Sequence, residues 1–213
     1  MKKFTLIVIF ICILALFSVS AFAFDSDNLN SLTVYNETGF DIWYLHVSPE
    51  DSEGWGADVL GSERTLDEGE SLGFYILYPD ECNSFDIMAI DEDGDSYIIW
   101  DYEFCDGYEE ELEITLADLD EEFELDLEEV TIINDTGYDI WYIFISPEDS
   151  RETWGIDHLD DETILYDGDS VEFLAPAGAS FDVMLVDEDE DTYTRYNTEL
   201  SGKLVIDISD YDD

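Results

Sequence analysis

Basic residues are almost missing from this chain. Only 6 of its 213 residues are Lys or Arg, against 57 Asp and Glu, which gives a formal net charge of −51 at pH 7. A field of that sign repels nucleic acids and anionic membrane surfaces, so we exclude both as partners. Cations are expected to gather around the protein as counter-ions.

The residues and motifs that usually carry catalysis are scarce as well. The chain has 2 His and 3 Cys, and it contains no Gly-rich phosphate loop, His-Glu-x-x-His, Gly-x-Ser-x-Gly or paired Cys-x-x-Cys motif. Carboxylates are so abundant that no pair stands out as an acid and base. We therefore predict a protein that is not an enzyme, with no catalytic residues and no cofactor, calcium being the one ion left open.

Only one long apolar run is present, and it lies near the N-terminus. The chain opens with Met-Lys-Lys, continues with an apolar run over residues 6–17, and reaches Ala-Phe-Ala at 21–23. This order is typical of a secretory signal, and about a dozen strongly apolar residues are too few to span a bilayer comfortably. We predict that residues 1–23 are a signal peptide and that the protein is secreted or periplasmic, a membrane anchor being the less favoured alternative.

The rest of the chain contains two copies of one unit. Residues 33–52 return 98 positions later as 131–150, with 13 of 20 positions identical. A period this long indicates a duplicated domain. The expected boundaries are a spacer at 24–31, a first repeat at 32–116, an acidic linker at 117–129 and a second repeat at 130–213.

Each copy alternates short apolar stretches with turns rich in Gly, Asn and Asp. This spacing gives about seven short strands per copy, as in a β-sandwich. We predict an all-β fold of two tandem antiparallel β-sandwich domains, Ig-like or C2-like. Alternation along one strand predicts that Trp43, Leu45 and Val47 face the core. Because each copy carries its own strand set, we expect the copies to fold as separable units.

Two connecting segments allow more than one interpretation. The pattern Trp-Gly-x-Asp-x-Leu occurs at 55–60 and at 154–159, and we interpret it as a loop whose Trp and Leu plug the end of the sandwich, a ligand-stacking Trp being the alternative. Segment 117–129 holds eight acidic residues. An extended, self-repelling linker is favoured there over an extra edge strand, because blocks of like charge resist packing.

Two acidic loops are the best candidates for a metal site. Carboxylates at alternate positions of a loop suit a hard cation such as calcium. Both loops depart from an EF-hand at its glycine and at its final glutamate, so a solvated hairpin tip is the favoured interpretation. The candidate ligands are Asp91, Asp93 and Asp95 in the first copy and Asp187, Asp189 and Asp191 in the second.

Aromatic side chains offer a different kind of site. Sugar rings stack on aromatic faces, and Tyr44, Tyr142 and Trp100 are the candidates for such a ligand platform. We expect a binding or surface module whose partner is an unidentified protein or glycan. The two specific alternatives are a calcium-dependent module that uses the acidic loops and a carbohydrate-binding module that uses the exposed aromatics.

Several motifs occur together in a known group of proteins. The Asn-x-Thr-Gly turn, the aromatic strand ending in Ser, and Trp-Gly-x-Asp-x-Leu resemble a group of small secreted bacterial β proteins with no assigned function. The resemblance covers 32–116 and 130–208; it implies export and a β fold, and it implies no chemistry. In that group a Cys often precedes the Phe/Tyr-Asp strand and another ends the next strand, and Cys82 and Cys105 look like that pair.

The register of the acidic hairpin also supports that pairing. If Asp93-Gly94 is a two-residue turn, Cys82 stands opposite Cys105, and an exported chain meets an oxidising compartment. We predict a Cys82–Cys105 disulfide. The same register places Asp86 opposite Asp101, a like-charge pair that should be unfavourable. Summed repulsion of this kind predicts that salt stabilises the fold, by general screening in preference to specific calcium sites.

Overall fold

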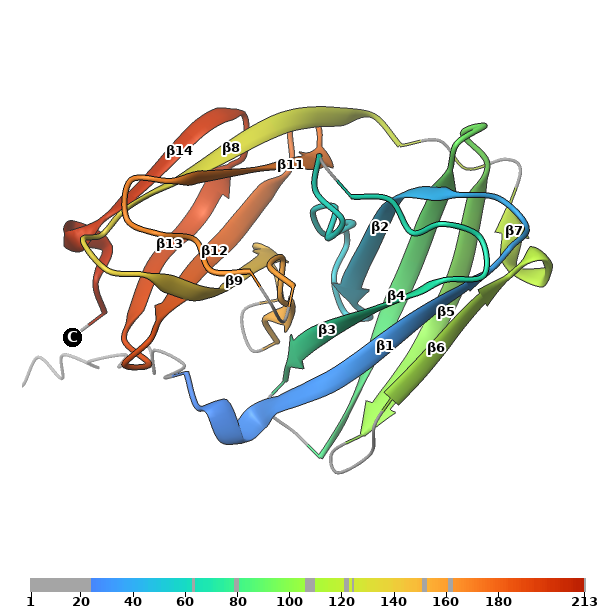
Figure 1. Ribbon diagram of the computed structural model, residues 1–213, viewed down its shortest axis with the longest axis horizontal. Coiled ribbons are helices and arrows are strands. Elements are labelled where there is room, and N and C mark those ends of the chain that lie inside the picture. The colour runs from blue at the N-terminus through green and yellow to red at the C-terminus, as the bar shows by residue number, and fades with distance from the viewer. Residues whose placement is uncertain are drawn as a thin grey trace, which may run out of the picture.

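The computed structural model shows two β-sandwiches side by side (Figure 1). Among the residues it describes, no helix has the length and apolarity needed to cross a membrane. The predicted signal peptide, residues 1–23, lies outside the described residues. The structure describes residues 24–62, 64–78, 81–105, 110–120, 123, 125–150, 153–160 and 163–212.

The strands alternate with tight turns throughout, as the spacing of Gly, Asn and Asp predicts. The first copy contains η1 (Ser26–Asn28), β1 (Leu29–Glu37), β2 (Ile42–Pro49), β3 (Ser71–Leu77), β4 (Cys82–Asp91), β5 (Ser96–Cys105), β6 (Glu110–Thr115), η2 (Leu116–Asp118) and β7 (Leu119–Asp120). The second contains β8 (Leu127–Asp135), β9 (Ile140–Pro147), β10 (Gly155–Ile156), β11 (Ser170–Pro176), β12 (Ser180–Asp187), β13 (Thr192–Glu199), β14 (Gly202–Asp207) and η3 (Ile208–Asp210).

Two sheets face each other in each copy, which confirms the predicted all-β sandwich. In the first copy the sheets are β10-β3-β1-β6 and β2-β4-β5-β7; in the second they are β11-β8-β14 and β13-β12-β9. Their inner faces bury one apolar core per sandwich. The pairings are antiparallel except for β1 with β6 and β8 with β14, which are parallel. The first and last long strands of each copy therefore run side by side in the same direction. The prediction of antiparallel sheets holds for the other pairings and fails for this one in each copy.

The two copies exchange edge strands. β10 belongs to the second copy but pairs with β3 of the first, with Ile156 opposite Ile76, and Ile156 lies in the core of the first copy. In return, the Asp58 N–H donates to the Leu174 carbonyl on β11 at 2.7 Å, and Ala57 lies in the core of the second copy. The Trp-Gly-x-Asp-x-Leu segment thus adds an edge to the neighbouring sandwich. Its leucines, Leu60 and Leu159, are buried in the cores of their own copies, as the interpretation as a plug predicted, whereas Trp55 and Trp154 pack outside these two cores.

The same segments also stay attached to their own copy. The Val59 N–H donates to the Leu45 carbonyl on β2, and the His158 N–H donates to the Ile143 carbonyl on β9, each at 2.8 Å. Each exchanged segment therefore bridges a sheet of one copy to a sheet of the other. These bridges join the sheets of the two copies. The first copy's sheet includes β10 of the second copy, whereas the sheets of the second copy consist of its own strands.

The segments that precede each copy cross over as well. Phe24, in the predicted spacer, is buried on the second copy, where its ring stacks on Tyr142 with centroids 5.6 Å apart. Phe123, in the predicted linker, meets Trp55 of the first copy edge to face at 5.9 Å. The linker also forms β7, which pairs with the start of β5. In the described part of the linker, Phe123 and Leu125 pack against the first copy, contrary to the favoured interpretation as a self-repelling linker, because these apolar side chains have surface to bury.

Both described ends of the chain reach one hairpin. The Ser26 hydroxyl donates to the Glu190 carboxylate at 2.7 Å, and the Asp212 N–H donates to the Thr192 carbonyl at 2.9 Å. Glu190 and Thr192 lie at the tip of the β12-β13 hairpin.

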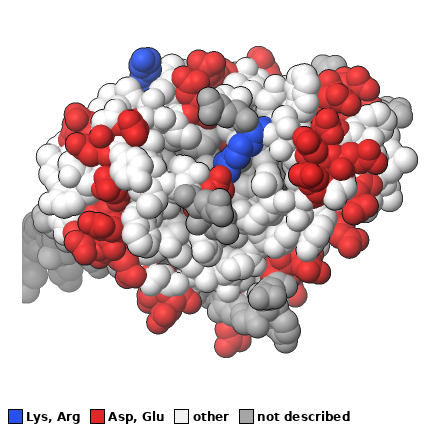
Figure 2. Space-filling view, in the orientation of Figure 1, with Lys and Arg blue, Asp and Glu red and all other residues white. Residues whose placement is uncertain are grey.

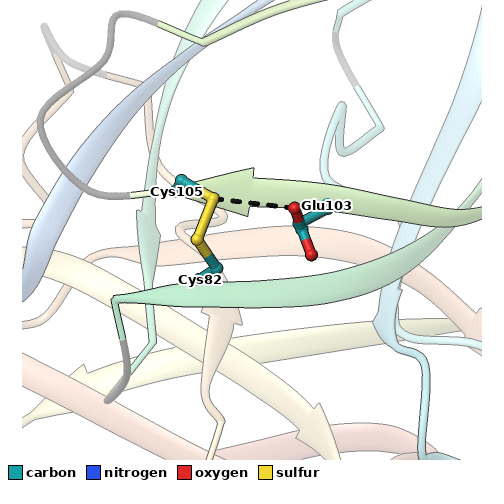
Figure 3. A group of neighbouring side chains, drawn as sticks. All are labelled: Cys82, Glu103 and Cys105. Carbon is teal, nitrogen blue, oxygen red and sulfur yellow. Dashed lines mark hydrogen bonds between the residues drawn. A yellow bond between two sulfur atoms is a disulfide. The ribbon is translucent and has the colours of Figure 1, made fainter.

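The Cys82–Cys105 disulfide is present, as predicted (Figure 3). Cys82 and Cys105 are register partners on β4 and β5, but the pairing shifts by one residue beyond Phe85. Near the turn the register is therefore not that of a two-residue Asp93-Gly94 turn. A bulge at Asp101, which has a positive φ of 56°, restores the expected pairing at the cysteines.

The bulge also changes the predicted clash of like charges. Instead of facing the Asp101 carboxylate, Asp86 accepts a hydrogen bond from the Asp101 N–H at 2.9 Å. The second copy repeats this arrangement, with the Asn197 N–H donating to Asp182 at 2.7 Å. The acid at this position caps a bulge, so the predicted direct opposition of the two residues was wrong. Some repulsion remains, because burial and then the charge of Asp101 raise the pKa of Asp86.

A second bulge moves a tryptophan out of the core. The pairing of β2 with β4 shifts between Ile42 and Tyr44, so that Ile42, Leu45 and Val47 are buried while Trp43 is 44% exposed. Trp141 is exposed to the same extent in the second copy. Strict alternation across the bulge was the reason that the prediction for Trp43 failed.

Candidate functional site

Each acidic loop is organised by its first aspartate. Asp91 is buried; its Oδ1 accepts the N–H groups of Asp93 and Asp95, both at 2.9 Å, and its Oδ2 accepts the Tyr97 hydroxyl at 2.9 Å. Asp187 makes the equivalent three bonds at 3.0, 3.0 and 3.1 Å. These carboxylates close the turn from inside, which is a structural role that needs no ion.

The other candidate calcium ligands point elsewhere. Asp93, Asp95, Asp189 and Asp191 are exposed. A search of the described part of the chain for three converging metal-ligand side chains finds Cys82, Glu103 and Cys105 and none of these loop residues. This group is the disulfide with the Glu103 carboxylate beside it (Figure 3), at 3.9 Å from the Cys105 sulfur. A disulfide sulfur has no proton to donate and no thiolate to offer a metal.

Two of the three predicted aromatic platforms are covered by the protein itself. Tyr142 lies beneath Phe24 and against Tyr75, and its ring is partly buried. Tyr44 packs, also partly buried, in a cluster on the outer face of the β2-β4-β5 sheet, together with Trp55 and the linker residue Phe123. Neither ring offers an open face of the kind that a sugar requires.

Trp100 is different, because it stands on that outer face with 57% of its surface exposed. The half-buried Trp55 lies beside it, with ring centroids 5.4 Å apart and planes inclined by 40°. Phe123 holds Trp55 from the other side. We call Trp55 and Trp100 the tryptophan pair.

The second copy contains a related pair. Trp154 lies 6.4 Å from Tyr196, which is 45% exposed, but Trp154 is itself buried. Sequence reasoning identified Trp100 and named a ligand-stacking Trp in segment 55–60 as an alternative, but it did not predict that the two rings lie side by side, since Trp55 reaches Trp100 only through the fold. The signal was available, because Trp55 and Trp154 recur at the same place in the repeat.

The buried polar residues have structural roles. The Asp58 Oδ1 accepts the N–H groups of Leu45 and Leu60 at 2.9 and 3.1 Å, which fixes the exchanged segment on β2. Burial raises the pKa of Asp58 to about 7, against the opposing effect of these bonds. Burial likewise raises the pKa of Asp157, the matching residue, well above its usual range. His46, whose Nδ1–H donates to the Gly56 carbonyl at 2.9 Å, is inaccessible, and burial lowers its pKa to about 4.

A cavity of about 580 Å³ opens where the two copies meet. Arg64 crosses it: its guanidinium donates to the Leu60 carbonyl of the first copy at 2.8 Å and to the Asp160 carboxylate of the second at 3.0 Å. The apolar wall includes Phe173. Figure 2 shows acidic side chains gathered toward the two ends of this face, with a mainly uncharged surface between them. The Arg64 guanidinium thus links the two copies, and its N–H groups donate to protein acceptors on both sides.

Known proteins resemble this chain only weakly. No family model matches the chain, and no curated protein matches it. One similar solved structure is the crystal structure of CBMbc (family CBM26) from Eubacterium rectale Amy13K in complex with maltoheptaose. That match covers 83% of this chain and 91% of the other, with 14% identity and a TM-score of 0.24. A score this low transfers neither fold nor ligand to the present chain.

Proposed function

We propose that this protein is an exported, non-enzymatic binding module and that the tryptophan pair is its ligand surface. The observation that carries the proposal is the exposure of Trp100 beside Trp55 on the outer face of a rigid sheet. Large aromatic faces held open to solvent cost free energy unless they meet a ligand, and sugar rings have matching apolar faces. A neutral or cationic glycan is the favoured ligand, since the surrounding charge repels anions.

Several features support export and binding over catalysis. The disulfide suits an oxidising compartment. The histidines of the described chain are both buried, and the carboxylates with raised pKa hold backbone amides inside the fold. A calcium-dependent module is less favoured, because the first aspartate of each loop already uses its oxygens to close the turn.

The test is glycan binding by the intact protein and by two matched tryptophan variants. A neutral glycan array identifies the ligand, and titration calorimetry measures its affinity. Trp100→Ala should weaken binding at least about tenfold, the loss expected of one stacking ring. Trp43→Ala removes a similarly exposed indole from β2 and should leave affinity unchanged.

The proposal fails if no neutral glycan binds, or if Trp43→Ala and Trp100→Ala weaken binding equally. Binding that requires calcium and is lost in Asp93→Ala would replace the tryptophan pair with the acidic loops. Both variants change exposed side chains, so an unaltered melting temperature shows that loss of binding is not loss of fold.

A further inference from the structure

The contacts between the two copies come in equivalent pairs. Asp58 bonds to Leu174 of the second copy at 2.7 Å, and Asp157 bonds to Tyr75 of the first at 2.8 Å. Phe24, which precedes the first copy, covers the second, while Phe123, which precedes the second, covers the first. The interface is thus built like a two-fold symmetric dimer whose subunits trade edge strands, although one chain supplies both halves.

Two differences make the interface selective for unlike copies. The first core receives the large Ile156, whereas the second receives the small Ala57. Arg64 pairs with Asp160, and the matching positions, Thr163 and Gly61, could not form such an ion pair. If a first repeat packed against another first repeat, or a second against another second, the inserted side chain would be too small or too large for the core. Arg64 or Asp160 would also be left without its ion-pair partner.

We propose that two molecules of this protein form a closed dimer by exchanging whole repeats. The first repeat of each chain pairs with the second repeat of the other through the contacts that now join them within one chain. No new surface is required, because every exchanged strand, buried ring and ion pair is reproduced. The occupant of the interface is a second copy of this chain.

The linker sets the balance between monomer and dimer. A short tether presents one repeat to the other at an effective concentration on the order of 1 mM, so monomer dominates in dilute solution. Once formed, the dimer is slow to revert, since separation breaks hydrogen-bonded strands and exposes Ile156 and Phe24. Folding at high local concentration, as during export of many chains, favours exchange.

The experiment refolds the intact chain from denaturant at protein concentrations from about 1 µM to about 1 mM, spanning the effective concentration. Two batches carry donor and acceptor dyes on an exposed residue, and light scattering after gel filtration measures mass. We expect mixed dimers after the batches are unfolded and refolded together. The ratio of dimer to monomer should rise roughly in proportion to concentration while monomer is in excess.

A cysteine pair tells exchange from ordinary surface association. Ile76→Cys with Ile156→Cys places cysteines at register partners on β3 and β10. Oxidation then links two chains covalently in an exchanged dimer, and it links one chain to itself in a monomer. If these core substitutions prevent folding, the dye experiment on the unmodified sequence still decides.

Two outcomes overturn the proposal. One is monomer at every refolding concentration. The other is mixed dimer that forms when native batches are combined without unfolding, because exchange requires the interface to open. Neither outcome depends on glycan binding, so failure here leaves the proposed function standing, and the reverse also holds.

Discussion

Glu190 and Gly94 occupy the same turn position in the two copies, and both have left-handed backbone, with φ of 67° and 87°. Glycine adopts this conformation without strain, whereas a residue with a Cβ pays about 1–2 kcal/mol. Glu190→Gly relieves this strain but also removes the exposed hydrogen bond from Ser26, so it should stabilise the protein by about 0.5 kcal/mol in urea unfolding. The control is the exposed neighbour Glu188→Gly, which has no such strain to relieve. Equal effects of the two changes would contradict the strain argument.

The close fit at Gly56 makes a second prediction. A Cβ on Gly56 would lie 2.7 Å from the Val47 carbonyl oxygen, whereas a Cβ on Gly54 would meet nothing within 4 Å. Gly56→Ala must move Trp55 and the exchanged segment, and it should cost about 1–3 kcal/mol. Gly54→Ala should be neutral or slightly stabilising. Thermal melts of both variants give the comparison, and a harmless Gly56→Ala would show that the segment is loosely held.

Ile156 makes the stability of the first copy depend on the second. Ile156→Ala should cost about 2–4 kcal/mol, because it leaves a cavity in the first core. Unfolding should remain a single transition, with tryptophan fluorescence and circular dichroism changing together, since the copies share strands. Ile164→Ala, at an exposed position of the second copy, is the control. Two separate transitions in any variant would restore the expectation of separable units.

Stability should rise as the solution is made mildly acidic. Burial raises the pKa of Asp58 from 3.8 to about 7, so the folded carboxyl keeps its proton where the unfolded one has lost it. This contribution is complete below about pH 4 and is lost as the pH rises through about 7, with a size on the order of 4 kcal/mol. Asp58→Asn retains an oxygen for Leu45 and Leu60 and should flatten the pH profile between 4 and 7.

The control for that profile is Asp51→Asn, which removes an equal charge from an exposed site. It should leave the slope intact, because general repulsion is shared by all the acids. Urea midpoints at several pH values give the measurement. A profile that Asp51→Asn flattens as much as Asp58→Asn would assign the effect to net charge.

Salt separates general screening from specific cation sites. The net charge of −51 predicts a higher melting temperature in about 1 M sodium chloride, where the Debye length is about 3 Å. Millimolar calcium at matched ionic strength should add little, since Asp91 and Asp187 are engaged in closing their turns. A rise of several degrees at 1 mM calcium that disappears in Asp93→Ala would reverse this order.

Local patterns in the sequence predicted much of the fold. The repeat, the strands of each copy, the sandwich and the disulfide follow from alternation, turn residues and cysteine position. Predictions failed where one residue shifts a register: at Trp43, where a bulge exposes the ring, and at Asp101, where a bulge replaces a clash with a cap.

The exchange of edges could not be predicted from the same patterns. The edge of a sheet can pair with any extended backbone of suitable shape. The sequence of Gly155-Ile156 therefore does not indicate whether this segment pairs with its own sandwich or with the neighbouring one. Trp100 could be identified as an aromatic on a strand, but its exposure depends on a sheet face that only the fold defines. Tyr44 and Tyr142 had the same sequence signal and are covered by distant segments.

The attachment of both chain ends to the β12-β13 hairpin has a mechanical consequence. Ser26 holds Glu190, and Asp212 holds Thr192 two residues further on. A tether that pulls on Phe24 and Asp212 would load these two contacts of the hairpin before the force reaches β1 and β14. An anchored or crowded molecule would therefore yield first where its two described ends hold this hairpin.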